Sequence, residues 1–405
     1  MADDMGYETL SSYGGTSYET PNIDRLAASG IVFNHAISQP LCTPSRVKIM
    51  TGQYNYRNYE YFGRLGSDQK TFGHLMQENG YATCIAGKWQ LNGLAYKDEL
   101  KDWADSTRPQ QLGFQEHCLW QLTKERKEGE RFANPLIQQN GVVLPRDEDS
   151  YGPDIFSQFI LDFIEKKQDQ AFFIYYPMVL VHDPFVPTPD SEAWSDPTKR
   201  YEADTSYFGD MVSYTDKIVG KIVSKLEALE LLDNTLIIFT GDNGTHPSIY
   251  SHTTNGIVRG GKGNTIDAGT HVPLIMSWGN QTEQTIQYDG LVEFSDFYAT
   301  FADIVDADDS TDGQSFLPVL KGESTKFYRE TAFVHYDPKW GKNVNRYRNQ
   351  FVQTPNYKLY QDGRFYNLQT DKLEQNDLVS TVLSPKEMAI KKRLETEMRL
   401  HPEFE

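Results

Sequence analysis

The sequence predicts an α/β fold, with a large mixed, mostly parallel sheet sandwiched by helices and a small C-terminal antiparallel sheet plus helix. Two observations predict it. Short apolar runs alternate with helical patterns over roughly the first three hundred residues, which is typical of sheets whose strands are connected by helices. After about Gly322 the runs become short and are separated by turn signals, as in antiparallel sheets. We therefore expect a main α/β domain over residues 1–322 and an α+β subdomain over residues 323–405.

The buried strands of the main domain are predicted from brief runs rich in Ile, Val and aromatic residues. These runs are 82–86, 171–176, 235–240 and 272–276. Helical patterns cover 71–79 and 155–167 between them. The clearest helix is 211–232, whose apolar residues recur at spacings of three and four before the strand that begins at 235. A helix that leads directly into a strand is typical of a parallel α/β sheet.

The C-terminal subdomain is predicted from four short β-like runs and a charged helix. The runs are 331–336, 351–353, 357–360 and 364–367, and the helix covers 385 to about 399. Asp362-Gly363 between the last two runs is a typical hairpin turn. We expect these elements to pack against the main domain.

Composition argues against several classes of protein. The chain has 405 residues, with 39 Lys plus Arg against 57 Asp plus Glu and a formal net charge of −18. A general nucleic-acid binder needs clustered Lys and Arg, so this class is disfavoured. No apolar stretch approaches the roughly 18 residues of a membrane-spanning helix. The three cysteines, Cys42, Cys84 and Cys118, form no Cys-x-x-Cys pair, so neither a disulfide framework nor a zinc cluster is indicated.

Cys42-Thr43-Pro44-Ser45-Arg46 is the sharpest local signal. Pro44 fits the first turn of a helix, where the hydroxyls of Thr43 and Ser45 can satisfy unpaired backbone N–H groups. Cys42 would then lie at the positive end of a helix dipole, beside Arg46, where an anion is held. The alternative interpretation is a buried structural cysteine near a helix start.

Two acidic motifs suggest a metal site. Asp3-Asp4 lies at the start of the chain, and Asp242-Asn243 directly follows a predicted core strand. Oxygen ligands of this kind suit a hard divalent cation such as calcium, and open α/β sheets bind ligands at the carboxyl ends of their strands. The alternative is that Asp242-Asn243-Gly244 is an ordinary turn.

Basic residues and a histidine follow strands at the same expected edge. Lys88 lies in Gly87-Lys88-Trp89, and Arg259 and Lys262 flank a glycine pair. Glycine lets the backbone approach a ligand closely, which makes these residues more interesting than an isolated surface lysine. His182 follows the predicted strand 171–176, although a lone histidine is more often structural.

Taken together, these motifs resemble the type I, formylglycine-dependent sulfatases of the alkaline-phosphatase superfamily. The matching segments cover nearly the whole chain in the family's order: 2–7, 20–26, 42–46, 80–89, 240–244 and 261–273. The resemblance implies a sulfatase that hydrolyses sulfate esters, with a sulfated carbohydrate or polysaccharide as substrate. It also implies that a maturation enzyme oxidises Cys42 to formylglycine, whose hydrated gem-diol attacks sulfur.

The resemblance implies a role for each matching residue. The calcium ligands would be Asp3, Asp4, Asp242, Asn243 and the formylglycine at position 42. Arg46, Lys88 and Lys262 would stabilise the nucleophile and the transferring group. His182 would protonate the leaving alcohol with help from Lys262.

The chain departs from the family pattern at Gln90, which stands where a histidine commonly helps to release sulfate. Glutamine can hydrogen-bond the gem-diol or sulfate but cannot take up a proton, and His246 is a candidate replacement. We also expect Arg259 to supply positive potential for the substrate and Trp340 to contact it from the C-terminal part. Two other functions stay open: a phosphate or phosphonate ester hydrolase of the same superfamily, and a non-catalytic carbohydrate-binding relative.

Family members carry a hydrophobic central strand immediately before the Asp-Asp pair, and this sequence shows none ahead of Asp3. We expect that strand, and any signal peptide ahead of it, to precede residue 1 in the natural protein. By the same resemblance we expect a periplasmic or secreted location.

Overall fold

The computed structural model describes residues 1–279, 286–323 and 329–404. Its main part holds two five-stranded sheets. The strands of the first sheet are β1 (Ile31–Ile37), β7 (Leu236–Thr240), β10 (His271–Val272), β11 (Leu274–Trp278) and β12 (Ile286–Glu293). Those of the second are β2 (Ala82–Lys88), β3 (Glu116–Trp120), β4 (Ile137–Gln139), β5 (Val142–Val143) and β6 (Phe172–Tyr175).

The first residues of the chain lie between these two sheets and hydrogen-bond to both sides. Ala2 N donates to Thr240 O at the end of β7 at 2.7 Å, and Asp3 N donates to Leu180 O, in the segment after β6, at 2.7 Å. This bonding makes the two sheets parts of one continuous layer and carries Asp3 to the ends of β6 and β7.

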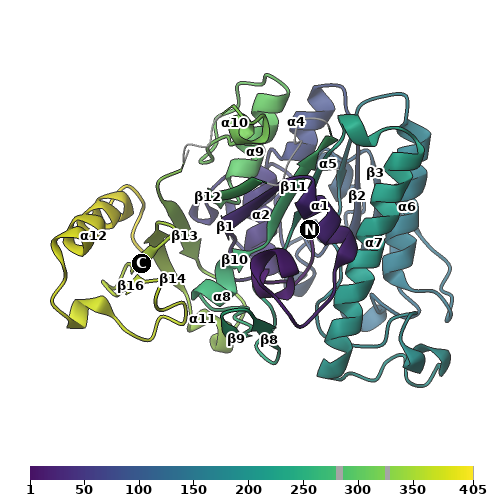
Figure 1. The fold of residues 1–405 in the computed structure, drawn as a ribbon. Coiled ribbons are helices and arrows are strands. Elements are labelled where there is room, and N and C mark those ends of the chain that lie inside the picture. The colour runs from purple at the N-terminus through teal and green to yellow at the C-terminus, as the bar shows by residue number, and fades with distance from the viewer. Residues whose placement is uncertain (280–285, 324–328, 405) are drawn as a thin grey trace.

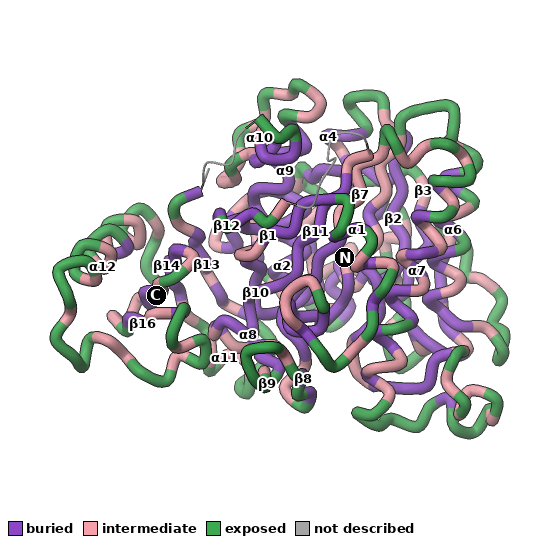
Figure 2. The backbone as a smooth tube through the Cα atoms, viewed as in Figure 1, coloured by how far each residue is buried: buried purple, intermediate pink, exposed green. Residues whose placement is uncertain are grey.

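Helices cover both faces of this layer (Figure 1). On one face lie α1 (Pro21–Ala28), α6 (Gly152–Lys167) and α7 (Phe208–Ala228); on the other lie α2 (Cys42–Thr51), α4 (Phe72–Glu78) and α9 (Asp296–Ile304). Side chains that alternate along each strand supply the two cores. Cys84 and Ala86 pack with the α6 and α7 side, whereas Ile85 between them packs with the α4 and α9 side. Figure 2 shows that the buried residues follow this layer, with exposed residues on the outer loops.

The C-terminal part forms the predicted antiparallel sheet with its helix. Its strands pair in sequence order and are β13 (Ala332–Tyr336), β14 (Asn349–Gln353), β15 (Tyr357–Tyr360) and β16 (Phe365–Asn367). Helix α12 (Pro385–Met398) packs against β14 and β15 at the far side of the molecule (Figure 1). Ser384 and Glu387 form a capping box at its start.

Shorter elements complete the described chain. They are α3 (Asn55–Asn58), α5 (Arg108–Gln111), α8 (Asp267–Thr270), α10 (Leu317–Leu320), α11 (Lys342–Asn345), β8 (Tyr250–Thr253) and β9 (Gly256–Arg259). None of the helices within the described ranges is both long and apolar enough to cross a membrane.

The predicted fold class is confirmed: a mixed sheet between helices, with a small antiparallel sheet at the C-terminus. Strand β2 pairs parallel with β3 and β6, and β1 with β12, whereas the other pairings within the two sheets are antiparallel. Antiparallel pairing is therefore more common than the sequence suggested, because strand direction depends on the route of the connections. The domain boundary at residue 322 stays a prediction.

Candidate active site

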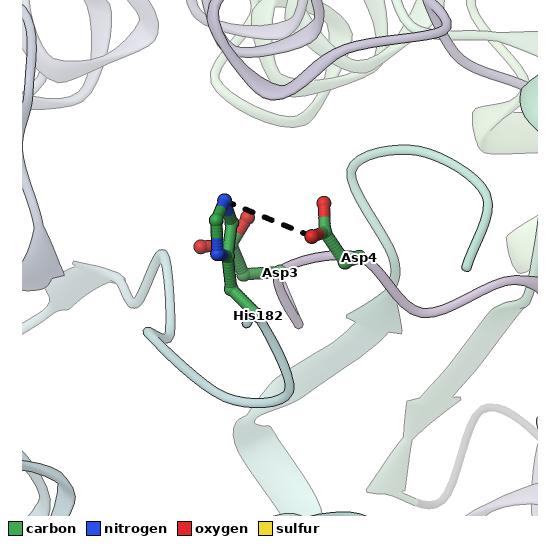
Figure 3. Close-up of side chains that lie close together, drawn as sticks. All are labelled: Asp3, Asp4 and His182. Atoms are coloured by element: carbon green, nitrogen blue, oxygen red, sulfur yellow. Dashed lines mark ion pairs between the residues drawn. The ribbon is translucent and has the colours of Figure 1, made fainter. Parts of the chain in front are cut away.

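Segments from distant parts of the chain bring charged side chains together at one edge of the sheet. Lys88 ends β2, Asp242 follows β7, and His182 follows β6. Asp3 and Asp4 reach the same place, and Figure 3 shows their carboxylates beside the His182 ring, with His182 Nε2 3.7 Å from Asp4 Oδ2. The sheet edge predicted from sequence is therefore where these residues meet.

Helix α2 places Cys42 and Arg46 against this cluster. The helix begins at Cys42, and all ten of its residues are buried. The hydroxyls of Thr43 and Ser45 do not cap the start of α2 as expected. Instead, Ser45 Oγ accepts from Gln39 N at 3.1 Å, and Thr43 Oγ1 accepts from Gly63 N at 3.2 Å. These hydroxyls bind N–H groups of neighbouring loops, which fixes the approach of the chain to Cys42.

The acidic residues form a compact group around Cys42. One ligand atom each from Asp3, Cys42 and Asp242 lies within 4.8 Å of the others. Asn243 Nδ2 donates to Asp4 Oδ1 at 2.9 Å, but the buried Oδ1 of Asn243 has no hydrogen-bond partner among the described residues. A buried amide oxygen without a donor is costly in a protein, and a cation bound here would satisfy it. The donor set, carboxylate and amide oxygens, fits calcium.

The electrostatics of the acidic group also fit a cation. Burial, together with Asp3 and Asp4, raises the pKa of Asp242 well above its ordinary value. Burial opposes ionisation of Asp3 too, but Lys88, His182 and Lys262 outweigh it and hold the pKa of Asp3 well below its ordinary value. A bound divalent cation would relieve the repulsion among the three carboxylates.

The three cations predicted from sequence each lie next to Cys42 or to an acidic residue of the group. Lys88 Nζ donates to both carboxylate oxygens of Asp3, at 2.8 and 3.0 Å. Lys262 Nζ lies 2.5 Å from Asp4 Oδ2. Arg46 donates only to backbone carbonyls, among them Cys42 O at 3.2 Å, and its buried Nη2 has no partner in the described chain. Arg46 therefore keeps an unpaired donor beside Cys42.

His182 and Lys262 form a hydrogen-bonded pair. Lys262 Nζ lies 3.0 Å from His182 Nε2, and His182 Nδ1 lies 2.6 Å from Asp183 O and 3.0 Å from Asp183 Oδ1. Burial lowers the pKa of His182, with a smaller contribution from Lys262 and an opposing one from Asp4. Burial also lowers the pKa of Lys262, but Asp4, Cys42 and Asp3 outweigh it and the pKa lies above its ordinary value. The shared proton therefore resides on Lys262, and His182 presents Nε2 as an acceptor.

Two family models match the chain and decide which family it belongs to. A family model described as Sulfatase matches residues 1–307, and a model described as N-sulphoglucosamine sulphohydrolase, C-terminal, matches residues 262–402. The chain belongs to the sulfatase family. Its reaction class is therefore the hydrolysis of sulfuric esters, and the predicted family and enzyme class are confirmed.

Individual sulfatases resemble the chain over most of its length. An N-acetylgalactosamine-6-O-sulfatase from Bacteroides thetaiotaomicron is 29% identical over 399 residues, covering 80% of this chain and 76% of that protein. Arylsulfatase A from Bos taurus is 29% identical over 369 residues, covering 83% and 69%. A solved structure in complex with its substrate D-glucosamine-2-N,6-O-disulfate has a TM-score of 0.77 at 21% identity, covering 98% of this chain and 96% of that one. This last likeness shows a shared fold.

Four further residues were predicted to bind substrate in this site, and their surroundings in the structure differ: Gln90, His246, Arg259 and Trp340. Gln90 follows β2 at a φ of 47°, and its buried amide oxygen has no partner in the described chain. Trp340 is 48% exposed and packs on Phe62, with ring centroids 4.0 Å apart. Phe62 in turn belongs to the apolar cluster that contains Cys42. The roles of Gln90 and Trp340 in substrate binding stay predictions.

The contacts that His246 and Arg259 make in the described chain do not include Cys42. His246 Nδ1 bonds Ser248 Oγ at 2.8 Å. Arg259 Nε donates to Pro247 O at 2.8 Å, and its guanidinium lies over Tyr250, 5.6 Å from the ring centroid. Neither contact tests a role in substrate binding, so both roles stay predictions.

Sequence reasoning missed Arg131, which the fold brings beside Asp3. Its guanidinium is 2% exposed, and Nη1 lies 3.9 Å from Asp3 Oδ2. Arg131 follows a polar loop with no strand end, glycine pair or motif to mark it. Only the tertiary structure identifies this residue.

Proposed function

We propose that this sulfatase removes sulfate from sulfated carbohydrates, with a formylglycine derived from Cys42 and one calcium ion. The observation that supports this most is the meeting of Cys42 with Asp3 and Asp242, whose ligand atoms lie within 4.8 Å of one another. Asp3, Asp4, Asp242 and Asn243 would hold calcium, together with the oxygen at position 42. When present, calcium stabilises negative charge on the reacting oxygens, and formylglycine supplies a hydrated aldehyde as nucleophile.

The cationic side chains hold the sulfate group. Arg46 keeps Nη2 free to donate, and it is fixed by its bonds to the carbonyls of Cys42 and Trp89. Lys88 is buried beside Asp3, and its two hydrogen bonds to that carboxylate fix the position of its ammonium group. Donors fixed before the substrate arrives need no reorganisation as charge develops, which is the main way that such sites lower a barrier.

The pair of His182 and Lys262 supplies the proton for the leaving alcohol. The proton is held at Lys262 Nζ and can pass across the 3.0 Å hydrogen bond to His182 Nε2. Asp183 accepts from His182 Nδ1–H and fixes the ring tautomer. This arrangement allows His182 to deliver a proton without being charged in the resting site.

Gln90 contributes a hydrogen bond rather than a proton transfer. Its position after Lys88 and Trp89 places its amide in the loop whose carbonyls hold Arg46. An amide can orient an oxygen of the nucleophile or of sulfate. The carbohydrate is contacted from the C-terminal side by Trp340, whose exposed ring suits stacking on a sugar.

A 6-O-sulfated amino sugar is the first substrate to test. The Bacteroides relative is named for 6-O-sulfate on N-acetylgalactosamine, and the substrate in the similar solved structure carries a 6-O-sulfate on glucosamine. A glycan substrate also agrees with a periplasmic or secreted location and with maturation by a formylglycine-generating enzyme. We therefore propose both for the natural protein.

The test is sulfate release from a panel of sulfated mono- and disaccharides by protein matured together with that enzyme. Free sulfate is measured by ion chromatography, with a phosphorylated and a phosphonate ester as the competing substrates. Peptide mass spectrometry at residue 42 verifies maturation, because formylglycine is about 18 Da lighter than cysteine. Mature protein that cleaves only the phosphorus esters would overturn the proposal.

A further inference from the structure

Arg131 is a buried arginine whose side chain has no hydrogen-bond acceptor within the part of the chain that the structure describes. Its Nη1 is fully buried without a partner, and the nearest carboxylate oxygen, Asp3 Oδ2, lies 3.9 Å away. The guanidinium lies over the Trp120 ring, 4.4 Å from its centroid, and 5.6 Å from the centroid of Phe132. These two rings hold the guanidinium in place without using its N–H groups.

Two other buried arginines, Arg108 and Arg200, each donate several hydrogen bonds, although the buried Nε of Arg108 has no partner in the described chain. Arg108 donates to Leu65 O at 3.0 Å and to Asp102 Oδ2 at 2.5 Å. Arg200 lies over Trp194 in the way that Arg131 lies over Trp120, yet it donates to Trp194 O, Glu148 O and Asp149 Oδ1 at 2.8 to 3.0 Å. A buried guanidinium normally has its charge and donors satisfied, since leaving them unpaired is costly. Unlike Arg108 and Arg200, Arg131 makes no side-chain hydrogen bond in the described chain that would offset its burial.

Asp3 does not need Arg131 as a partner. Lys88 already donates to both oxygens of the Asp3 carboxylate, at 2.8 and 3.0 Å. The guanidinium stands beyond hydrogen-bonding distance of Asp3 while facing the same group of charges, because it also influences His182 and Asp183 electrostatically. The unpaired Nη1 of Arg131 thus lies beside Asp3, and the charges of Asp4 and Asp183 also act on the guanidinium.

We propose that Arg131 binds the sulfate group of the substrate and of the product directly. It would be an additional cation of the reaction site, by which we mean Cys42, the acidic group around it and the cations beside them. This inference rests on the proposed function, which places sulfate beside Asp3 and Cys42. A guanidinium offers parallel N–H donors that match two oxygens of a sulfate, and such charge-assisted bonds are strong. The bound anion satisfies the donors that the fold leaves free, so the energy lost on burying Arg131 is recovered when sulfate binds.

The experiment measures binding of inorganic sulfate to the calcium-loaded protein by titration calorimetry and by thermal shift, with sodium chloride at equal ionic strength as reference. Arg131→Gln should weaken sulfate binding by about 10–100-fold, the worth of a hydrogen bond to a charged group. Arg131→Lys should recover part of that loss because it keeps the charge. Arg200→Gln is the matched control, since it removes an arginine stacked on tryptophan outside the site, and should bind sulfate as the wild type does.

Stability without sulfate gives a second, independent readout. Arg131→Gln removes no hydrogen bond but loses the ion pair with Asp3 and the two ring contacts, so it should lower Tm in calcium less than Arg200→Gln does. Sulfate affinity of Arg131→Gln equal to that of the wild type would overturn the inference while leaving the proposed function intact. If Arg131→Gln does not fold, Arg131→Lys carries the same comparison, and unchanged sulfate binding there together with unchanged KM would overturn it.

Activity separates the two proposals. A wild type that binds sulfate through Arg131 yet cleaves no sulfate ester would refute the proposed function alone. A wild type that cleaves sulfate esters with the same KM and the same inhibition by sulfate as Arg131→Gln would refute the role of Arg131 alone.

Discussion

Arg46 and Lys48 lie two positions apart on helix α2, and both side chains are buried, but their surroundings differ. Two positions along an α-helix correspond to a rotation of about 200°, so the side chains point to opposite sides. Lys48 Nζ donates to Glu293 Oε2 at 2.7 Å and to Phe333 O at 3.0 Å. Arg46 reaches the reaction site and keeps an unpaired donor. Helix α2 thus connects a region in which the buried charges are paired (the closed region) to a region in which a buried donor is unpaired.

The closed region is an anchoring network of Lys48, Glu293, Asp296 and Arg329. Arg329 Nη1 lies 3.1 Å from Glu293 Oε1, and its Nε donates to Asp296 at 2.9 Å. Positive and negative groups are equal in number, and none of the buried side-chain N and O atoms in this network is without a partner within the described residues. It joins α2, β12 and α9 to the start of the C-terminal sheet.

The reaction site has the opposite character. Arg46 Nη2, Arg131 Nη1 and Asn243 Oδ1 are buried without partners in the described chain. Buried polar atoms are nearly always satisfied in native proteins, and a bound ion or ligand is one explanation for an exception. Both regions are buried and charged, so neither property separates them. They differ in whether each buried polar atom has a hydrogen-bond partner, as in the anchoring network, or lacks one, as at these three atoms of the reaction site.

Cys42→Ala should have the largest effect, a loss of sulfatase activity of about 10³-fold or more, because it removes the nucleophile that performs the covalent step. The small side chain at the start of α2 should leave Tm within a few degrees of the wild type. Activity of more than a few per cent of the wild type would refute the formylglycine mechanism. Cys84→Ala, at a buried cysteine outside the site, is the control and should retain activity.

Arg329→Met should instead destabilise the fold by about 3–5 kcal/mol, because it leaves Glu293 and Asp296 buried with too little positive charge. Urea unfolding measures this change, and kcat/KM of the folded fraction should match the wild type. The double variant Lys48→Met with Glu293→Gln removes both members of one pair and should cost less. A severe loss of kcat in folded Arg329→Met would show that the network also serves the chemistry.

Calcium removal should reduce both activity and stability through the reaction site. A ligand present at about 100 times its Kd stabilises a protein by about 2.7 kcal/mol, so chelation should lower the free energy of unfolding by this order, and added calcium should restore it. Asp242→Asn should weaken calcium binding and reduce the effect of the chelator. If chelation changes the anchoring-network variants but not the wild type, the assignment of the metal site is wrong.

Trp340→Ala should have the smallest effect, a rise in KM of about 2–10-fold with kcat nearly unchanged. An aromatic contact is worth about 0.5–1.5 kcal/mol, and Trp340 is proposed to contact the sugar rather than the reacting atoms. Measured on a sulfated disaccharide and on a small aryl sulfate, the rise should occur only with the sugar. An equal rise for both substrates would show that Trp340 acts by packing on Phe62.

Most elements follow from local sequence pattern. The predicted helices at 71–79 and 155–167 correspond to α4 and α6, and the predicted strand at 235–240 corresponds to β7. Periodicity and turn residues act over a few positions, so one sequence reveals them. Lys88 and Asp242 were visible for the same reason, because each lies at the end of a strand and the carboxyl ends of strands meet at one sheet edge.

The tertiary structure alone decided which charges meet and which are left unpaired. The direction of β11 against β7 depends on the path of a long connection, and the distance from Arg131 to Asp3 depends on folding of a loop that no local pattern marks. Lys48 and Arg46 differ in sequence by two positions on one helix, yet one is neutralised by Glu293 from a distant strand and the other is not. Electrostatic interaction depends on distance in space, which the sequence by itself does not contain.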